Sequence, residues 1–169
     1  MDFDLQRLLS PISDDAPAGP DLSYDPDFLA LEQAAQGKPE QQFGETVIPA
    51  EEPDWQEVKR RCQTLLTRSK DLRAAVLYAR ALTNTDQSEG LAAGLELIRD
   101  ILSRYWDSLH PELERDADND PTMRLNALGP LADPSTFLRE IRNAQIASSQ
   151  QHGRVAFRDI LVAAGKLPP

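Results

Sequence analysis

Apolar residues recur along this chain at steps of three and four, the spacing of amphipathic α-helices. Three stripes show it most clearly: Trp55-Val58-Cys62-Leu65-Leu66, Leu72-Val76-Ala79-Leu82 and Leu91-Leu95-Ile98-Leu102-Tyr105. The first two predict an antiparallel helical hairpin that turns near Ser69. The third predicts the longest helix, from about Asp86 to Leu109, with Leu95 in the core and Arg99 outside it. Pro111 would end that helix.

Aspartates mark the helix starts. Asp25, Asp120 and Asp133 each precede a proline, which favours an N-cap followed by Pro at the first helical position. Asp54 and Asp86 each precede a glutamate by three residues, the spacing of a capping box. Together with the apolar spacing, these signals predict shorter helices at residues 3–9, 26–36, 121–128, 134–143 and 157–164, the last ended by Gly165.

Two stretches lack the helical pattern, residues 10–24 and 37–53. A third, around the Gln-Gln-His-Gly turn, predicts a small β-hairpin that pairs residues 146–148 with 154–156. Loops as long as 37–53 are usually functional or fixed to the domain surface. Its apolar residues, Phe43, Val47 and Ile48, therefore either pin the loop to the helical body or meet a partner.

The chain is long enough for one domain with a substantial core. It has 169 residues, 40% hydrophobic and 27% charged, and a domain of this size buries roughly 70% of its unfolded surface. The patterns predict an all-α fold, a compact multi-helix domain of about seven to nine helices, with the small hairpin near the C-terminus as its only strand pair. We expect the domain to span residues 1–165 and a linker to begin at residues 166–169.

Charge restricts the partners. The formal net charge is −10, and the 18 basic residues form no evident cluster in the sequence, so nucleic acid and anionic membranes are poor partners; mimicry of DNA by the acidic surface is a minor alternative. Cys62 is the single cysteine, and neither a signal peptide nor a membrane span is evident. These features favour a cytoplasmic location.

Residues that could support catalysis are few. His110 lies near Glu112, but a histidine at the C-terminal end of the long helix is more simply explained by its favourable interaction with free carbonyls. Cys62 occupies an apolar helical position and is expected to be a buried hydrophobe. Trp106 is expected to pack against helices, and His152 to lie in a solvated turn. No nucleophile, phosphate-loop or zinc motif occurs.

Alternating aspartates at positions 116, 118 and 120 are similar to the start of a calcium loop. However, Pro121 and Ala127 stand where that loop requires Gly and Glu. We expect a solvated acidic loop whose last member, Asp120, caps the following helix, with weak divalent binding as the alternative. The prediction is therefore no catalytic, cofactor-binding or metal-binding residue and no cofactor.

Four segments, in order, resemble the ImpA-type N-terminal domain of TssA proteins, assembly components of the type VI secretion machine. They are Leu8-Leu9-Ser-Pro-Ile-Ser-Asp-Asp-Ala-Pro-Ala-Gly, Tyr24-Asp-Pro-Asp-Phe-Leu, Gln42-Phe-Gly-Glu-Thr-Val-Ile-Pro-Ala-Glu-Glu-Pro-Asp-Trp55, and Tyr105-Trp-Asp-Ser-Leu-His-Pro111 with Asn119-Asp-Pro-Thr-Met-Arg-Leu-Asn-Ala-Leu128. The resemblance implies an all-α, non-catalytic domain at the N-terminus of a longer cytoplasmic protein.

The resemblance also implies partners, namely the baseplate, inner-tube, sheath and membrane-complex proteins of that machine. It implies a full-length protein that is homo-oligomeric through a C-terminal region absent here, with this chain a monomer or weak dimer. Candidate partner-binding residues are Phe43, Val47, Ile48, Asn119, Arg124 and Asn126. The alternatives are a small helical metal-dependent hydrolase that uses His110 and the acidic loop, and a regulatory adaptor unrelated to secretion.

Overall fold

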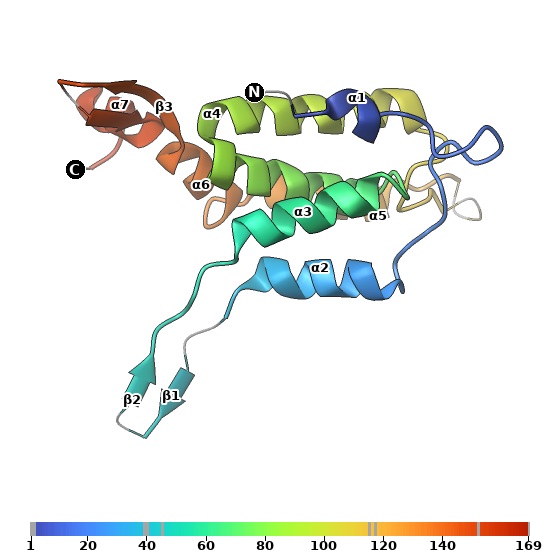
Figure 1. The fold of residues 1–169 in the computed structure, drawn as a ribbon, viewed down its shortest axis with the longest axis horizontal. Coiled ribbons are helices and arrows are strands. Elements are labelled where there is room, and N and C mark those ends of the chain that lie inside the picture. Colours follow the sequence, from blue (N-terminus) through green and yellow to red (C-terminus); the bar gives the residue numbers. More distant parts are fainter. Residues whose placement is uncertain are drawn as a thin grey trace.

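The computed structural model describes residues 3–38, 41–44, 46–114, 116, 118–151 and 153–168. Helices make up most of it, and two small antiparallel hairpins stand at its periphery (Figure 1). The elements are α1 (Leu5–Leu8), α2 (Pro26–Gln36), β1 (Gln41–Phe43), β2 (Thr46–Ile48), α3 (Trp55–Leu66), α4 (Leu72–Tyr105), α5 (Thr122–Leu128), the 3-10 helix η2 (Gly129–Ala132), α6 (Phe137–Asn143), β3 (Gln145–Ser149), β4 (Gly153–Ala156) and α7 (Phe157–Ala163).

The helical hairpin predicted from the first two stripes is confirmed as α3 and the first half of α4. The side chain of Asp54 accepts hydrogen bonds from the backbone N–H groups of Gln56 and Glu57, which caps α3. The apolar stripe of α3 is buried from Val58 to Leu66, Cys62 included, and Trp55 is partly buried. Burial raises the pKa of the Cys62 thiol. On the other side of α3 lies α2, whose bounds match the prediction and whose Asp25 cap is formed.

The long helix α4 is two helices joined at a break. Gln87 has φ 60° and ψ −138°, outside the helical region, at the place where the sequence predicts a new helix start. The two arms then run side by side (Figure 1). A Cβ atom added to Gly94 would lie 2.6 Å from the Ala79 Cα, and one added to Gly90 would lie 2.2 Å from the Leu82 carbonyl oxygen. These small residues allow the backbones of the two arms to meet.

The buried face of the second arm differs from the prediction. Ile98 and Tyr105 are buried as expected, but Leu95 is 43% exposed, whereas Leu97 and Ile101 are fully buried. The predicted stripe is therefore wrong at Leu95. The closest approach between the arms, at Gly90 and Gly94, rotates the buried face toward Leu97, and glycines carry no apolar signal in a periodicity analysis.

The segment of residues 10–24 is irregular, as predicted, and it is fixed to one end of the helical body. The Lys70 ammonium donates to the carbonyl oxygens of Leu8 (2.7 Å) and Leu66 (2.9 Å). The Tyr105 hydroxyl donates to the Leu9 carbonyl at 2.6 Å, and the Lys70 backbone N–H donates to Ala18 at 2.6 Å. Desolvation lowers the pKa of Lys70 to about 8.

On the C-terminal side, α6 is attached to the body by a buried ion pair. The Arg80 guanidinium on α4 lies 2.6 Å from the Glu140 carboxylate on α6, and it also stacks over the Trp55 ring. The α6 helix begins three residues later than predicted, because Asp133 caps a turn through the Ser135 N–H and hydroxyl group. The helix therefore starts at Phe137, which is buried.

The all-α prediction is confirmed only in part. The predicted C-terminal hairpin is present as β3 and β4, but a second hairpin, β1 and β2, lies inside the stretch that we expected to be a loop. The helix count also matches only in part, because the helices predicted on either side of Asp86 run on as α4 with one break.

Candidate interaction surface

The β1–β2 hairpin carries the first set of predicted partner-binding residues. Gln41 pairs with Ile48, Gln42 with Val47, and Phe43 with Thr46. In the turn, Gly44 adopts φ 62°, a left-handed conformation that favours glycine. Figure 1 shows the two strands standing away from the helices.

Polar contacts close the base of this hairpin, and one of them links it to the body. Lys38 and Glu51 exchange backbone hydrogen bonds of 2.9 Å, and their side chains form an ion pair at 2.6 Å. Beyond them, Glu52 lies 3.3 Å from the Arg139 guanidinium of α6. These contacts lie where the strands leave the body, so the tip extends beyond its support.

The tip presents apolar side chains to solvent. Val47 is 52% exposed and Ile48 is 44% exposed. The interpretation that these two residues pin the segment to the helical body is therefore wrong. Phe43 has a described backbone, but its side chain lies outside the described residues. Because successive side chains of a strand point to opposite faces, Val47 and Ile48 expose apolar surface on both faces of the protruding hairpin, and such surface is available to a partner that encloses the tip.

The second predicted set lies around α5, and only part of it is at the surface. Asn119 and Asn126 are exposed, and Asn119 adopts a left-handed φ of 59°. Arg124 is 1% exposed, and its guanidinium donates to the carbonyl oxygens of Trp106, Leu109 and Pro111. The structure thus places Arg124 inside the protein, and we withdraw it from the partner-binding residues.

The buried guanidinium of Arg124 also contacts an aromatic ring. Its guanidinium lies 4.7 Å from the centroid of the half-exposed Trp106 ring, and burial lowers the pKa of Arg124.

The other face of α5 turns two apolar side chains, Met123 and Leu125, to solvent. The sequence analysis did not identify this exposed pair, because it gave only the bounds of this short helix and not the side that faces the core.

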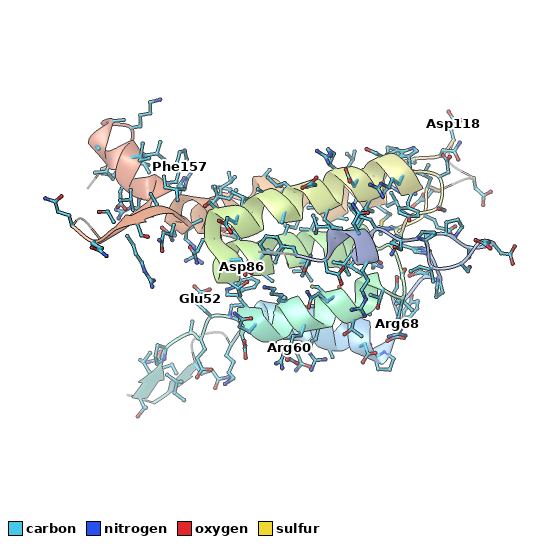
Figure 2. The ribbon with its side chains drawn as sticks, turned by 45° about the horizontal axis from the view of Figure 1, so that its top comes forward. Glu52, Arg60, Arg68, Asp86, Asp118 and Phe157 are labelled. Atoms are coloured by element: carbon cyan, nitrogen blue, oxygen red, sulfur yellow. The ribbon has the colours of Figure 1, made fainter. Side chains whose placement is uncertain are left out.

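The two sets of candidates do not form one site. In Figure 2, Asp118, beside Asn119, lies at the right-hand end of the molecule, far from Glu52 at the base of the β1–β2 hairpin. Any single small partner would therefore contact one set only.

His110 is not placed as the sequence analysis expected. It follows the end of α4 by five residues, and its Nε2 lies 2.9 Å from the carbonyl oxygen of Gly19 on the N-terminal segment. The imidazole is 3% exposed. The explanation through the carbonyls at the helix end is thus wrong. A hydrolase that uses His110 on a water or substrate would need an accessible imidazole, so the burial weighs against this alternative.

The acidic loop instead supports a helix start. The Asp120 carboxylate accepts hydrogen bonds from the Thr122 N–H (2.8 Å) and hydroxyl (2.6 Å), and these bonds lower the pKa of Asp120. The predicted cap is therefore formed only in part: Asp120 accepts a hydrogen bond from the first residue of α5, but Pro121 occupies the N-cap position and the helix begins one residue later than expected. Within the described part of the chain, no group of three or more His, Cys, Asp or Glu residues is arranged to hold a metal ion. The predicted turn residue His152 lies outside the described residues.

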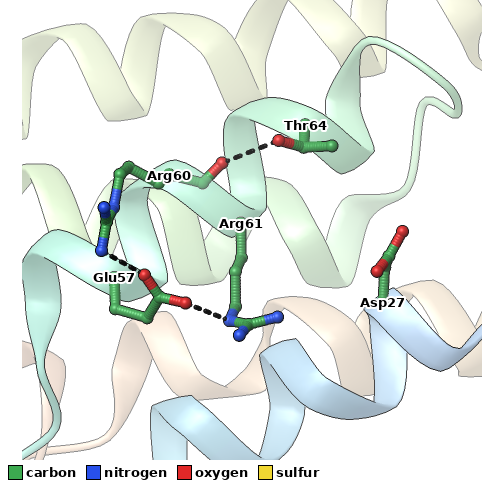
Figure 3. Close-up of a pocket in the computed structure, with 5 residues that line it drawn as sticks. All are labelled: Asp27, Glu57, Arg60, Arg61 and Thr64. Carbon is green, nitrogen blue, oxygen red and sulfur yellow. Dashed lines mark hydrogen bonds and ion pairs between the residues drawn. The ribbon is translucent and has the colours of Figure 1, made fainter.

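A surface hollow of about 280 Å³ lies between α2 and α3 (Figure 3). Its charges are already matched. Arg60 and Arg61 both pair with the Glu57 carboxylate, and Asp27 pairs with Arg68 at 2.8 Å. The hollow therefore offers no free charge for a ligand.

Comparison with known proteins decides the family. Residues 9–133 match the family described as the N-terminal part of ImpA, of the type VI secretion system. The chain belongs to this family. It is also 45% identical, over 164 residues, to the type VI secretion system component TssA1 of Pseudomonas aeruginosa, a match that covers 96% of this chain and 47% of the relative.

A solved structure supports the same assignment. It is the N-terminal domain, including the conserved ImpA_N region, of the TssA component from Burkholderia cenocepacia. It superposes with a TM-score of 0.67 at 27% identity, over 98% of this chain and 59% of that one. The ImpA-type chain thus spans about half the length of its curated relative. Among the helices of its described residues, none combines the length and the apolar composition needed to cross a bilayer.

Proposed function

We propose that this ImpA-type domain is a non-catalytic protein-interaction module of a cytoplasmic type VI secretion component. It would dock other secretion proteins through the tip of the β1–β2 hairpin. The observation that carries the proposal is the exposure of Val47 and Ile48 on strands that project from a well-packed helical body. Family membership supports the setting.

The apolar side chains at the tip can contribute more free energy to binding a partner than they contribute to folding. Fully burying a Val or Ile side chain contributes about 1.5 to 3 kcal/mol, and the fold leaves much of this unused at both residues. A short hairpin presents them at little ordering cost, because the Lys38 and Glu51 contacts already close its base and the Glu52–Arg139 ion pair links that base to α6.

The partners follow the family resemblance. Baseplate, inner-tube, sheath and membrane-complex proteins are the candidates, and we expect the full-length protein to form homo-oligomers through a region outside this chain. Asn119 and Asn126, with the exposed Met123 and Leu125 beside them, are a secondary candidate surface at the other end of the molecule.

A pull-down from the native organism tests the proposal. The bait is the wild-type chain, compared with Val47→Ser/Ile48→Ser and with Leu95→Ser, which alters a similarly exposed leucine on α4. We expect type VI secretion components to be recovered by the wild type and the Leu95 variant, and to be lost with the hairpin variant.

Other results would exclude the hairpin tip as the docking site or favour an alternative function. Equal recovery by all three baits would exclude the hairpin tip as the docking site. Recovery of proteins unrelated to secretion, again lost with the hairpin variant, would favour the regulatory adaptor. Hydrolytic turnover that disappears in His110→Ala would contradict a non-catalytic domain.

A further inference from the structure

Charge is divided unevenly along the chain. Residues 134–169 contain five Lys or Arg and two Asp or Glu, a net charge of +3. Residues 1–133 contain thirteen Lys or Arg and twenty-six Asp or Glu, a net charge of −13, and the two sums give the total of −10. The boundary coincides with the end of the family match at residue 133.

The basic residues also differ in their pairing. Among the described residues, the Lys and Arg side chains of residues 1–133 all form ion pairs or hydrogen bonds. The four described basic side chains with neither are Arg142, Arg154, Arg158 and Lys166. The sequence analysis expected no basic cluster, because it did not consider which cations the acidic body neutralises.

Arg142, Arg154 and Arg158 lie on a unit formed by α6, β3, β4 and α7 (Figure 1), and Lys166 follows α7. We call these elements and the residues after α7 the C-terminal arm. The Gln87 side chain at the α4 break accepts a hydrogen bond from the Gln145 N–H at 2.8 Å, which holds β3 to the body. The Asp159 carboxylate accepts from the Ala156 N–H at 2.8 Å, which fixes the start of α7. These two contacts order the backbone from which the charged side chains extend.

A small apolar cavity lies among these charges. It has a volume of about 200 Å³ and is lined by Arg139, Arg142, Asn143, Arg158, Leu167 and Pro168. The chain after α7 turns back, and the N–H groups of Lys166 and Leu167 donate to the Leu161 carbonyl, which sets Leu167 at the cavity. Beside Arg158, Phe157 and Ile160 are 40% and 47% exposed.

We propose that the C-terminal arm binds an acidic segment of a partner protein that also carries an apolar side chain. The apolar side chain would enter the cavity, while Arg142 and Arg158 pair with flanking carboxylates, for which planar guanidinium groups are well suited. A protein segment is favoured over a nucleic acid, because the cavity is apolar and a phosphate polymer carries no aliphatic side chain to fill it. Arg142 and Arg158 make no contact with Val47 or Ile48 at the β1–β2 hairpin tip, although Arg139 at the cavity pairs with Glu52 at the hairpin base. The two proposals are tested with different residues, so either can fail alone.

The test is binding of a synthetic peptide of alternating Glu-Glu and Leu-Leu pairs, measured by fluorescence anisotropy at low salt and at about 150 mM salt, where screening sets in beyond about 8 Å. The wild type is compared with Arg142→Glu/Arg158→Glu and with Arg60→Glu/Arg99→Glu. The second variant changes the net charge equally, at exposed sites on α3 and α4. Circular dichroism melts verify that each variant is folded.

We expect the arm variant to weaken peptide binding by at least about tenfold, the factor that corresponds to 1.4 kcal/mol. The control should retain nearly all of the affinity, and Arg142→Lys/Arg158→Lys should retain part of it. Equal losses in the arm and control variants would show that net charge alone acts and would overturn the proposal. So would equally tight binding of a polyglutamate peptide without leucine, or preferential binding of single-stranded oligothymidylate.

Discussion

The helical body and the β1–β2 hairpin use polar and apolar groups in opposite ways. Inside the body, Lys70 and Arg124 are buried, and their donors are used on backbone carbonyls that would otherwise lie unpaired at helix ends and in the N-terminal segment. On the hairpin, Val47 and Ile48 are exposed, although burial would stabilise them. Stabilising contacts are thus concentrated in the helical body, whereas the hairpin leaves apolar surface exposed to solvent. This is expected when a rigid scaffold presents a binding element.

The largest expected effect distinguishes the core from its edge on one helix. Leu97→Ala should lower the free energy of unfolding by about 2 to 5 kcal/mol, because the side chain is fully buried. Leu95→Ala, on the exposed side, should lower it by less than about 1 kcal/mol. Urea denaturation of both variants measures this, and equal losses would mean that the buried face is wrongly assigned.

The next effect concerns the buried polar groups. Arg124→Met should destabilise the fold by about 3 kcal/mol, since three backbone carbonyls lose their donor in the interior. Arg99→Met is the control, because Arg99 is exposed and pairs only with Glu96 and Asp100. Chemical denaturation gives both values. A loss at Arg124 no larger than that at Arg99 would show that these hydrogen bonds contribute little.

The third prediction uses pH. The pKa of Lys70 is about 8 in the fold against an ordinary 10.5, so between these values the unfolded chain binds more protons and stability rises with pH. The unfolding free energy of the wild type, relative to Lys70→Met, should therefore rise by about 2 kcal/mol between about pH 7 and about pH 9.5. Denaturant titrations across this range measure it. A constant difference would mean that Lys70 keeps its proton in the fold.

The smallest stability effect belongs to the hairpin. Val47→Ser/Ile48→Ser should change the free energy of unfolding by less than about 1 kcal/mol in total, because both side chains already contact water. For a domain of this size, that is a shift of roughly 4 °C or less in Tm. A larger fall in Tm would show that the two side chains stabilise the fold, and the hairpin would then not differ from the body in this respect.

Much of the helical body could be predicted from residue patterns. The Asp25 and Asp54 caps and the stripe of α3 are local signals, and the structure forms them as expected. The buried face of α4 and the first residue of α6 could not be predicted from the sequence. The glycines that bring the arms of α4 together turned Leu95 outward, and a turn after Asp133 delayed α6, because packing of distant segments decides both.

The candidate site was predictable only as a set of unusual residues. Val47 and Ile48 stood out as apolar residues in a polar stretch, but their pairing with Gln42 and Gln41 in a projecting hairpin depends on backbone geometry. Arg124 appeared in a motif that suggested a surface role, whereas three carbonyls from a distant turn hold it inside. The unpaired cations of the C-terminal arm emerged only once the ion pairs of the body were known.

Site-specific photo-crosslinking in cells that assemble the secretion machine tests the central claim most directly. A photoreactive amino acid is placed at position 47 on the hairpin tip or at position 95 on α4, two apolar positions of similar exposure. The account predicts a crosslink from position 47 to a secretion component and none from position 95. Crosslinks from position 95 with none from position 47 would contradict a scaffold that docks through its hairpin.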